Sequence, residues 1–415
     1  MQYMTEVKIK RIEGGVTYPS GFKASGIHCG LRKNKGKKDL ALIFSETDCN
    51  TAAIYTTNKV YGAPITVTRE HLKNGRARAV ICNSGNANTC NPDGVEKANI
   101  MCESVAKQLG ISADDVVIAS TGVIGVPLPL EPILSGIPKL CEELGSSPED
   151  GYSAAAAIMT TDTRLKQIAA ETMIGGVKVK IGGMSKGSGM IQPNMATMLS
   201  FVTTDAAIST DVLQTVLKSV ADRTFNMISV DGDTSTNDTF CVMASGLAGN
   251  TEINDLSSEE CKAFEELLEY VCKYLARKMA ADGEGASKLL ECRIRNCDEL
   301  QNARVLAKSV INSPLVKTAM FGSDANWGRI LCALGYSGID FDPNKVDVNF
   351  ISNAGEINVC MGGMSVGFDE DKAKEVLLED SIIIDINMNM GTESATAYGC
   401  DLTYEYVRIN GDYRS

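Results

Sequence analysis

One stretch constrains the fold of this chain more than any other: residues 182–205, which read GGMSKGSGMIQPNMATMLSFVTTD. Glycine occupies four of its first eight positions, which predicts a flexible segment rather than a helix or a central strand. Its later part, 198–204, combines apolar and β-branched residues and predicts a strand. Thr197 lies where the two parts meet. Because a strand fixes a side chain and a loop leaves it accessible, this hydroxyl is a candidate nucleophile.

The charge of the chain argues against several classes of partner. Its 415 residues carry a formal net charge of −12, whereas proteins that bind nucleic acid or anionic membranes need a basic face. The first ten residues lack the apolar core of a signal peptide. No run approaches the roughly 18 apolar residues of a membrane span. We therefore expect a cytoplasmic protein with no nucleic-acid or membrane partner.

Histidine and cysteine usage argues against a metal site. The 14 cysteines form no CxxC pair, and His28 and His71 are the only histidines. In a chain without an export signal, such cysteines are typically reduced thiols that pack as small apolar side chains. A structural zinc site is therefore not expected.

Alternating strand and helix patterns predict a mixed α/β fold. Residues 40–44 and 116–119 are short apolar runs typical of strands. Residues 95–109 carry an apolar face at helical spacing. Residues 131–144 also predict a helix, interrupted near Pro138 because proline lacks a backbone donor. We expect the N-terminal two-thirds to form layered sheets and helices around the candidate nucleophile.

The last third predicts a smaller α/β lobe, at about residues 290–415. Two alternating segments, 346–350 and 357–360, are separated by turn residues and predict a hairpin. The apolar segment 382–386 predicts a further strand. Residues 402–410 also alternate and predict a strand near the end of the chain.

Several polar segments have the composition of loops. The segments NSGNAN (83–88) and STGVIG (120–125) each follow an apolar run, and a turn is the favoured interpretation of both. The alternative is that their side chains and N–H groups face a ligand. The segment DGDTSTND (231–238) resembles a calcium loop but lacks Glu at the twelfth position. Glu284 follows a long helical pattern and is expected on a mobile terminus.

A G-x-S-x-G pattern at 183–187 is typical of Ser–His–Asp hydrolases, but the surrounding sequence argues against one. The nucleophile elbow of these enzymes needs a helix next, whereas glycines and Pro193 follow. It also needs a later histidine, and none follows His71. Walker A and G-x-G-x-x-G sequences are absent too, so nucleotide binding has no supporting motif.

An enzyme with so few histidines needs another general base, and a self-cleaving N-terminal nucleophile supplies one. Cutting the chain before Thr197 frees an α-amine, a group with a pKa of about 7.7–8.0, which suits base catalysis near neutral pH. The small Ala196 permits close approach of the hydroxyl to the peptide bond. Most threonines at strand starts are structural, so on these residues alone Thr197 is one candidate among several.

Seven segments, in order along the chain, carry a family resemblance. They are NSGNAN at 83–88, STGVIG at 120–125, MTTDT at 159–163, GMSKGSGMIQPNMATML at 183–199, DGDTSTNDT at 231–239, DGEGASK at 282–288 and FGSDANWGR at 321–329. Together they resemble the ornithine acetyltransferase family of arginine biosynthesis, the self-cleaving glutamate N-acetyltransferases. The resemblance covers nearly the whole chain and implies an N-terminal-nucleophile-like α/β acetyltransferase fold.

The resemblance implies an acyltransferase that cuts itself between Ala196 and Thr197, which leaves an alpha fragment, 1–196, and a beta fragment, 197–415. Thr197 would take the acetyl group of N2-acetylornithine and pass it to L-glutamate, in a ping-pong cycle. The family implies a heterotetramer of two alpha and two beta fragments and no cofactor. Acetyl-CoA stays open as a second acetyl donor.

The family motifs also imply roles for single residues. Thr121 and Gly122 would form the oxyanion hole through a hydroxyl and a backbone N–H. The substrate site would be lined by Thr160, Lys186, Thr197, Glu284, Asn410 and Ser415. Lys186 can hold a substrate carboxylate, and Glu284 can hold the ornithine ammonium. The family commonly ends in Thr, so Ser415 is a departure that keeps the hydroxyl and the terminal carboxylate.

Two other functions stay open at this point. An N-terminal-nucleophile amidase or aminopeptidase would pass the acyl group to water instead of glutamate. A small-molecule binding protein would keep the fold without the chemistry. Cleavage separates the binding protein from the two enzymes, and the fate of the acetyl group separates the enzymes.

Overall fold

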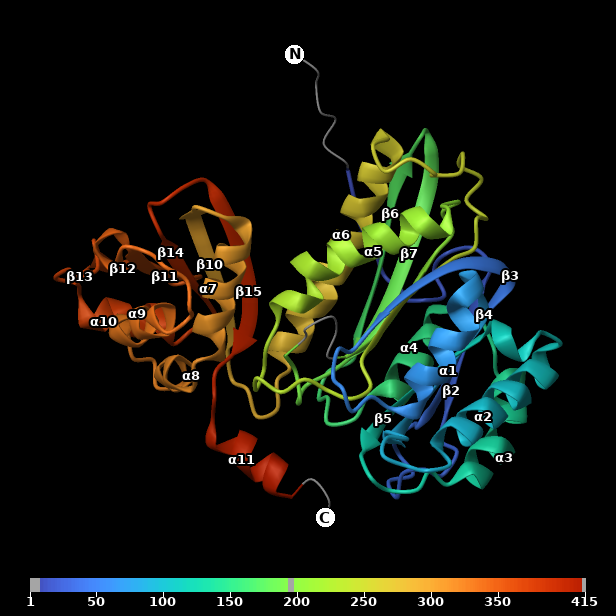
Figure 1. The fold of residues 1–415 in the computed structure, drawn as a ribbon. Helices are drawn as coiled ribbons and strands as arrows, with labels where there is room; N and C mark the ends of the chain where they lie inside the picture. Colours follow the sequence, from blue (N-terminus) through green and yellow to red (C-terminus); the bar gives the residue numbers. More distant parts are fainter. Residues whose placement is uncertain (1–7, 193–197, 413–415) are drawn as a thin grey trace. The chain divides into compact units, whose positions relative to one another are not determined.

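The computed structural model describes residues 8–192 and 198–412, and the chain divides into two compact units (Figure 1). The first unit comprises Met1–Gly187, Asn194–Phe225 and Thr234–Leu275. The second comprises Ser188–Pro193, Asn226–Asp233 and Ala276–Ser415. Each unit contains a sheet with helices packed on it, which confirms the predicted mixed α/β class.

The sheet of the first unit has nine strands in the described part of the chain. They are β1 Lys10–Ile12, β2 Phe22–Ile27, β3 Leu40–Tyr55, β4 Arg76–Asn86, β5 Val116–Val123, β6 Lys166–Ile174, β7 Val177–Lys186, β8 Leu199–Thr204 and β9 Thr239–Ala244. Their order is β1-β6-β7-β8-β9-β3-β4-β5, with β2 paired to β3. Most neighbours are antiparallel, but β8 runs parallel to β9, and β4 runs parallel to β5.

Helices pack on both faces of this sheet. Ile43 of β3 belongs to a core with α4, Pro148–Ile158, whereas its neighbour Leu42 belongs to a core with α2, Gly94–Leu109, and α3, Leu130–Glu142. This alternation follows the two-residue period of a strand. The unit also contains α1 Ala63–His71 and α5 Thr210–Arg223, and the long helix α6 Glu259–Ala281 extends from it into the second unit.

Helix α3 continues through Pro138, so the predicted interruption is wrong. Its residues Ile133, Ile137 and Leu140 are fully buried in the core. Burial of this apolar face offsets the backbone hydrogen bond that proline removes.

The glycines at 182 and 183 lie inside a central strand, so the prediction of a flexible segment is wrong for them. They belong to β7, which pairs with β6 on one side and β8 on the other. A Cβ atom on Gly182 would overlap the carbonyl oxygen of Gly15, and one on Gly183 would lie 3.1 Å from Leu275 in α6. Glycine is present here because other parts of the chain approach closely, not because the backbone is free.

The second unit contains a six-stranded sheet in the order β13-β12-β11-β14-β10-β15. The strands are β10 Leu289–Cys297, β11 Asp347–Ser352, β12 Gly355–Met361, β13 Met364–Ser365, β14 Ser381–Asn387 and β15 Glu393–Cys400. The helices are α7 Leu300–Asn312, α8 Pro314–Phe321, α9 Trp327–Gly335, α10 Glu370–Leu377 and α11 Tyr404–Gly411. The predicted hairpin is confirmed as the antiparallel pair β11 and β12. One face of the sheet forms an apolar core with α7 to α10.

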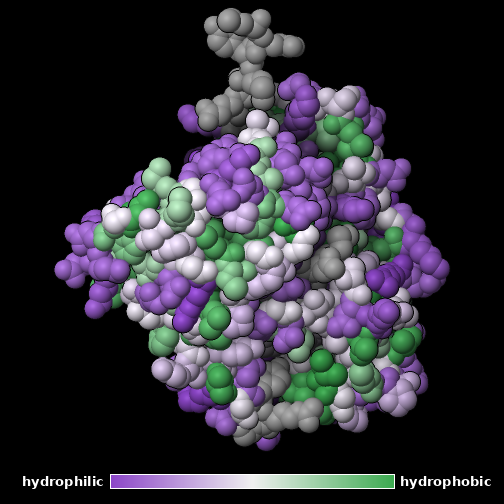
Figure 2. All heavy atoms as spheres, turned by 60° about the vertical axis from the view of Figure 1, so that its left-hand side comes forward, coloured by the Kyte–Doolittle hydropathy of each residue, from purple (hydrophilic) through white to green (hydrophobic). Residues whose placement is uncertain are grey.

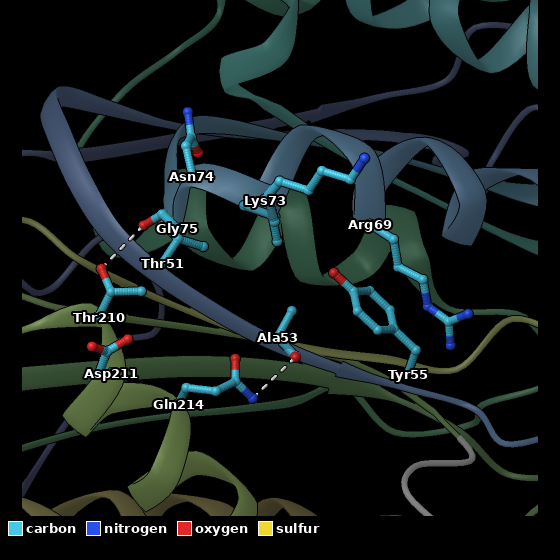
Figure 3. Close-up of a pocket in the computed structure, with 11 residues that line it drawn as sticks. Thr51, Ala53, Tyr55, Arg69, Lys73, Asn74, Gly75, Thr210, Asp211 and Gln214 are labelled. Atoms are coloured by element: carbon cyan, nitrogen blue, oxygen red, sulfur yellow. Dashed lines mark hydrogen bonds between the residues drawn. The ribbon is translucent and has the colours of Figure 1, made fainter.

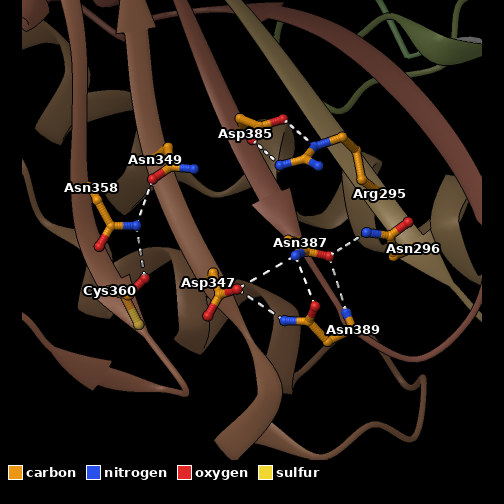
Figure 4. A network of polar contacts seen from close by, with 9 residues as sticks. All are labelled: Arg295, Asn296, Asp347, Asn349, Asn358, Cys360, Asp385, Asn387 and Asn389. Carbon is orange, nitrogen blue, oxygen red and sulfur yellow. Dashed lines mark hydrogen bonds and ion pairs between the residues drawn. The ribbon is translucent and has the colours of Figure 1, made fainter.

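The other face of this sheet carries paired polar side chains (Figure 4). Arg295 of β10 forms an ion pair with Asp385 of β14 at 2.6 Å. Asn358 Nδ2 of β12 donates a hydrogen bond to Asn349 Oδ1 of β11 at 2.6 Å. These pairs favour a single strand register, because a shift of one residue would turn them toward the apolar core.

The predicted strand at 402–410 is wrong, because helix α11 occupies most of this segment. The side chain of Thr403 caps the helix by accepting a hydrogen bond from the backbone N–H of Glu405. The apolar residues that suggested a strand are exposed: Tyr404 is 84% exposed and Val407 is 71% exposed. Their alternation therefore does not mark a buried face.

Candidate active site

Three of the predicted site residues lie close together in the first unit. Lys186 ends β7 and Thr121 lies near the end of β5. The Lys186 Nζ atom donates a hydrogen bond to Thr121 Oγ1 at 3.3 Å, and both residues are buried. Asp162 connects Thr160 to the same place, since its carboxylate accepts hydrogen bonds from the backbone N–H groups of Thr160 and Gly187.

Asp162 organises this cluster, although it is not among the residues predicted for the site. Its Oδ1 atom accepts hydrogen bonds from Gly187 N at 2.8 Å and Lys166 Nζ at 2.6 Å. Burial alone would raise the pKa of the Asp162 carboxyl, but the Lys166 and Lys186 ammonium groups outweigh burial and hold that pKa below its usual range. Its place in the MTTDT segment was the available signal.

A second buried carboxylate, that of Asp238, interacts electrostatically with Lys186. Asp238 directly precedes β9. Burial lowers the pKa of the Lys186 ammonium, and Asp162 and Asp238 oppose that effect. Burial also raises the pKa of the Asp238 carboxyl well above its usual value. Its Oδ2 atom is buried without a hydrogen-bond partner in the described part of the chain. The sequence pattern predicts a polar loop around Asp238 and indicates no role for it.

Gly122 belongs to β5 rather than to the turn predicted at 120–125. Its φ angle is +134°, and a Cβ atom there would overlap the backbone of Gly85 in the parallel neighbour β4. Only glycine fits this combination of backbone angle and close approach. The close contact between β4 and β5 therefore fixes the backbone of Gly122, directly after Thr121.

The segment NSGNAN likewise completes a strand, since residues 83–86 belong to β4. Asn83 Nδ2 donates to the Asn86 carbonyl at 2.9 Å, and Ser120 Oγ donates to Asn83 Oδ1 at 2.6 Å. Asn237 Nδ2 donates to the Ser120 carbonyl at 3.0 Å. The predicted turn is wrong, but these hydrogen bonds support a structural use of the Asn83 and Asn237 amides over ligand binding.

The candidate nucleophile Thr197, its neighbour Ala196 and the C-terminal Ser415 lie outside the described residues. The next residue in the chain, Met198, is buried, and its carbonyl accepts a hydrogen bond from Thr239 N at 2.9 Å. The predicted strand after it is confirmed as β8.

Glu284 and Asn410 form a pair in the second unit. Asn410 Nδ2, on α11, donates to Glu284 Oε2 at 2.8 Å. Glu284 is buried, and its backbone N–H donates to the Ser188 carbonyl at 2.8 Å, so the prediction of a mobile terminus is wrong. A Cβ atom on Gly189 would overlap the Glu284 carboxylate, which explains why glycine occupies that position.

A separate cavity of about 390 Å³ opens in the first unit (Figure 3). It is formed by β3, the end of α1 with the segment that follows it, and the start of α5. The Arg69 guanidinium lies 5.0 Å from the centre of the Tyr55 ring, and Asp211 and Gln214 reach the cavity from α5. Its lining includes none of the predicted site residues that the structure describes.

Residues 8–192 and 198–412 contain no group of three or more His, Cys, Asp or Glu side chains that could hold a metal ion. Within the same ranges, no helix combines the length and the apolar character needed to cross a membrane. On the face shown in Figure 2, the hydrophobic residues form scattered areas among hydrophilic ones.

Comparison with known protein families identifies the family of this chain. The ArgJ family profile matches residues 23–415. The chain belongs to the ArgJ family. The arginine biosynthesis bifunctional protein ArgJ of Caldanaerobacter subterraneus subsp. tengcongensis is 51% identical over 405 residues, which cover 97% of this chain and 99% of that protein.

Two solved structures are also similar to this chain. The arginine biosynthesis bifunctional protein argJ of Bacillus halodurans is 45% identical with a TM-score of 0.50, and the match covers 52% of this chain and 99% of the solved chain. The ornithine acetyltransferase of Mycobacterium tuberculosis, complexed with ornithine, is 38% identical with a TM-score of 0.43, over 46% of this chain and 100% of the solved chain. ArgJ membership confirms the prediction of an acyltransferase of arginine biosynthesis.

Proposed function

We propose that this ArgJ-family chain moves the acetyl group of N2-acetylornithine to L-glutamate in the cytoplasm, through an acetyl ester on Thr197. The observation that carries the proposal is the buried hydrogen bond between Lys186 Nζ and Thr121 Oγ1. Lys186 also pairs with Leu199 in the β7–β8 ladder. The strand that follows Thr197 therefore starts beside the lysine that holds Thr121.

The nucleophile arises by self-cleavage. The Thr197 hydroxyl attacks the Ala196 carbonyl carbon, the acyl group moves from nitrogen to oxygen, and water hydrolyses the resulting ester. Cleavage after residue 196 leaves 219 of the 415 residues in the second fragment, whose first residue is Thr197 with a free α-amine. The assembled enzyme contains two copies of each fragment.

In the first half-reaction, the α-amine of Thr197 takes the hydroxyl proton while Oγ forms a bond to the acetyl carbon. Thr121 O–H and Gly122 N–H donate to the oxyanion that develops. Lys186 supports this role, because the Thr121 oxygen that accepts from Lys186 can still donate its own hydrogen. The proton on the amine then passes to the ornithine nitrogen as the C–N bond breaks.

In the second half-reaction, the amine of L-glutamate attacks the acetyl-Thr197 carbonyl. The same two donors stabilise the oxyanion, and Thr197 Oγ leaves and regains a proton through its α-amine. The relatives carry the word bifunctional in their names. We assign the second activity to loading of Thr197 from acetyl-CoA.

Charged and polar side chains select the substrates. Lys186 binds the α-carboxylate that both substrates carry, and Glu284 binds the side-chain ammonium of ornithine. The hydrogen bond from Asn410 Nδ2 to Glu284 Oε2 supports this role, since it holds the carboxylate in one orientation. Thr160 and Ser415 also bind the substrates, through their hydroxyl groups.

The fate of the acetyl group tests this function. The enzyme is incubated with N2-acetylornithine, with and without L-glutamate, and ornithine, acetylglutamate and free acetate are measured. We expect acetylglutamate to equal the ornithine released when glutamate is present, and the Thr197→Ala variant to form neither product. Stoichiometric acetate that does not depend on glutamate would instead identify an amidase.

A further inference from the structure

The side-chain amide of Asn237 uses its full hydrogen-bonding capacity, and the residue is only 5% exposed. Its Oδ1 atom accepts hydrogen bonds from the hydroxyl groups of Thr89, at 2.6 Å, and Thr236, at 2.5 Å. Its Nδ2 atom donates to the carbonyl oxygens of Ala87, at 2.6 Å, and Ser120, at 3.0 Å. Because an amide has two N–H donors and two lone pairs on its oxygen, no capacity is left for a ligand.

The four partners also fix the direction of this amide. Carbonyl oxygens can only accept hydrogen bonds, so the NH₂ group must face them and the amide oxygen must face the hydroxyls. The space around the amide is limited too, since a Cβ atom on Gly62, directly before α1, would lie 2.7 Å from Asn237 Nδ2. A buried polar network in which every member is satisfied is rigid. Asn237 therefore holds both carbonyls in defined positions.

The amide connects segments that are far apart in the sequence. Ser120 lies 117 positions from Asn237, and Ala87 lies 150 positions from it. The three residues belong to the segments STGVIG, DGDTSTNDT and NSGNAN, in that order. The proposed function uses residues of STGVIG alone among these three. The hydrogen bonds of Asn237 indicate what the other two segments contribute.

The Ser120 carbonyl belongs to the peptide group that leads directly into Thr121. Because a peptide group is planar, a fixed carbonyl also fixes the nitrogen of Thr121 and the direction of its Cα atom. The Ser120 hydroxyl donates to Asn83 Oδ1 at 2.6 Å, which holds the same residue by its side chain. On the other side of Thr121, the close contact with β4 fixes Gly122 without any help from Asn237. The position of Thr121 is therefore the one that depends on the Asn237 amide.

We propose that Asn237 is a positioning residue, which holds the backbone of Thr121 so that its hydroxyl points to the oxyanion. This inference rests on the proposed function, in which Thr121 O–H is an oxyanion donor. Lys186 Nζ binds the oxygen of that hydroxyl at 3.3 Å, while Asn237 holds the peptide group before it. The side chain and the backbone of Thr121 are thus held by different elements. A donor that is already oriented needs no rearrangement when negative charge develops.

Loss of this contact is expected to slow the chemical step without weakening substrate binding. In Asn237→Ala the Ser120 carbonyl loses its donor, so the peptide group before Thr121 can rotate and displace the hydroxyl. We expect kcat to fall roughly 10- to 10²-fold, less than for complete removal of an oxyanion donor. KM for N2-acetylornithine is expected to stay within about threefold, because Asn237 hydrogen-bonds to none of the proposed substrate-binding residues.

The matched control is Asn250→Ala, which removes a buried amide of the same kind. Asn250 is 8% exposed, and its Nδ2 atom also donates to two carbonyl oxygens, those of Ala207 at 3.0 Å and Thr251 at 2.8 Å. Neither carbonyl belongs to a segment of the proposed site. Thermal melting compares the stability of the two variants, and steady-state kinetics compares their kcat. We expect both variants to melt below the wild type, and Asn250→Ala to keep the wild-type kcat.

A double-mutant cycle with Thr121→Ala separates positioning from a general loss of stability. If Asn237 acts through the Thr121 hydroxyl, it has nothing left to position once that hydroxyl is absent. We therefore expect Asn237→Ala to lower kcat by less than about threefold in the Thr121→Ala background. A merely structural role would lower kcat by the same factor in both backgrounds. The measured reaction is formation of acetylglutamate from N2-acetylornithine and L-glutamate.

Two results would overturn the inference: a kcat of Asn237→Ala within about threefold of the wild type, or equal losses of kcat in the two backgrounds. If Asn237→Ala does not fold, Asn237→Asp takes its place in the cycle, and the same two results decide. A carboxyl group keeps an oxygen for the two hydroxyls but cannot donate to both carbonyls. A wild-type enzyme that forms no acetylglutamate refutes the proposed function itself, whereas the inference fails only against an active wild type.

Discussion

Lys186 and Thr121 are separated by 65 positions in sequence, yet Lys186 Nζ lies 3.3 Å from Thr121 Oγ1. The two side chains come from β7 and β5, which are not neighbours in the sheet. Both are buried, so the hydrogen bond between them is shielded from water. A lysine that holds the oxygen of a threonine leaves the threonine hydrogen for another acceptor, and an oxyanion is such an acceptor.

Lys186→Met is expected to lower kcat/KM by at least about 10²-fold, because Thr121 loses the donor that orients it and the substrate carboxylate loses its partner. The matched control is Lys178→Met, which changes a lysine on the same strand whose side chain is 56% exposed. Steady-state kinetics of both variants check the prediction. Equal kcat/KM values in the two variants would show that Lys186 has no role in the site.

Gly122→Ala is expected to lower the free energy of unfolding by roughly 2–4 kcal/mol, since the new Cβ atom overlaps the Gly85 backbone and φ is +134°. Gly110→Ala is the control: its φ of +67° is also unfavourable for alanine, but nothing lies within 4 Å of the added atom. We expect the control to lose only about 1 kcal/mol. Urea unfolding of both variants measures the difference, and equal losses would show that the contact with β4 is unimportant.

The low pKa of the Asp162 carboxyl predicts how the free energy of unfolding changes in acid. Its folded pKa lies below the usual range, and an unfolded Asp has a pKa of about 3.9. The unfolded chain therefore binds the proton first as the pH falls, and the stabilisation present above about pH 4 is lost toward the lower folded pKa. In Asp162→Asn the charge that balances Lys166 is missing, so stability falls at pH 7 by roughly 3–5 kcal/mol.

The corresponding measurement is the urea midpoint between pH 7 and pH 3. We expect the midpoint of Asp162→Asn to fall less steeply below pH 4 than that of the wild type. Asp211→Asn serves as the exposed control and keeps the wild-type slope. Parallel curves for the wild type and Asp162→Asn would contradict the assigned pKa direction.

Gly189→Ala tests the position of Glu284 without changing its charge. The added Cβ atom overlaps the end of the Glu284 side chain, which is flexible enough to move away, so the fold is retained. If Glu284 binds the ornithine ammonium, its displacement raises KM for N2-acetylornithine by about tenfold and leaves KM for glutamate nearly unchanged. Gly367→Ala, with nothing within 4 Å, is the control. Equal KM values in both variants would argue against this role.

Local patterns predicted some elements well and failed where distant segments decide the structure. Helix α2, strand β8 and the β11–β12 hairpin agree with the sequence patterns because burial of one face sets their periodicity. The glycines of β7 were misinterpreted because Gly15 and α6, which approach them, come from remote parts of the chain. Helix α11 was misinterpreted because its alternating residues are exposed.

The site residues also divide into those that sequence motifs predict and those that depend on distant contacts. Thr121, Thr160 and Lys186 lie in recognisable motifs and were selected from the sequence. Asp162 and Asp238 were not given roles, because their importance depends on burial and on bonds to residues such as Gly187, 25 positions from Asp162. No local pattern indicates that a carboxylate will be buried opposite a lysine.

Intact mass spectrometry after incubation with N2-acetylornithine, in the absence of glutamate, tests whether Thr197 is the freed and acetylated nucleophile. We expect two fragments, with the bond between residues 196 and 197 cut, and a second fragment heavier by one acetyl group that glutamate then removes. Peptide mapping places that acetyl group on Thr197. A single uncut chain of 415 residues that still transfers acetyl groups, or an acetylated residue other than Thr197, would contradict the assignment of Thr197 as the nucleophile.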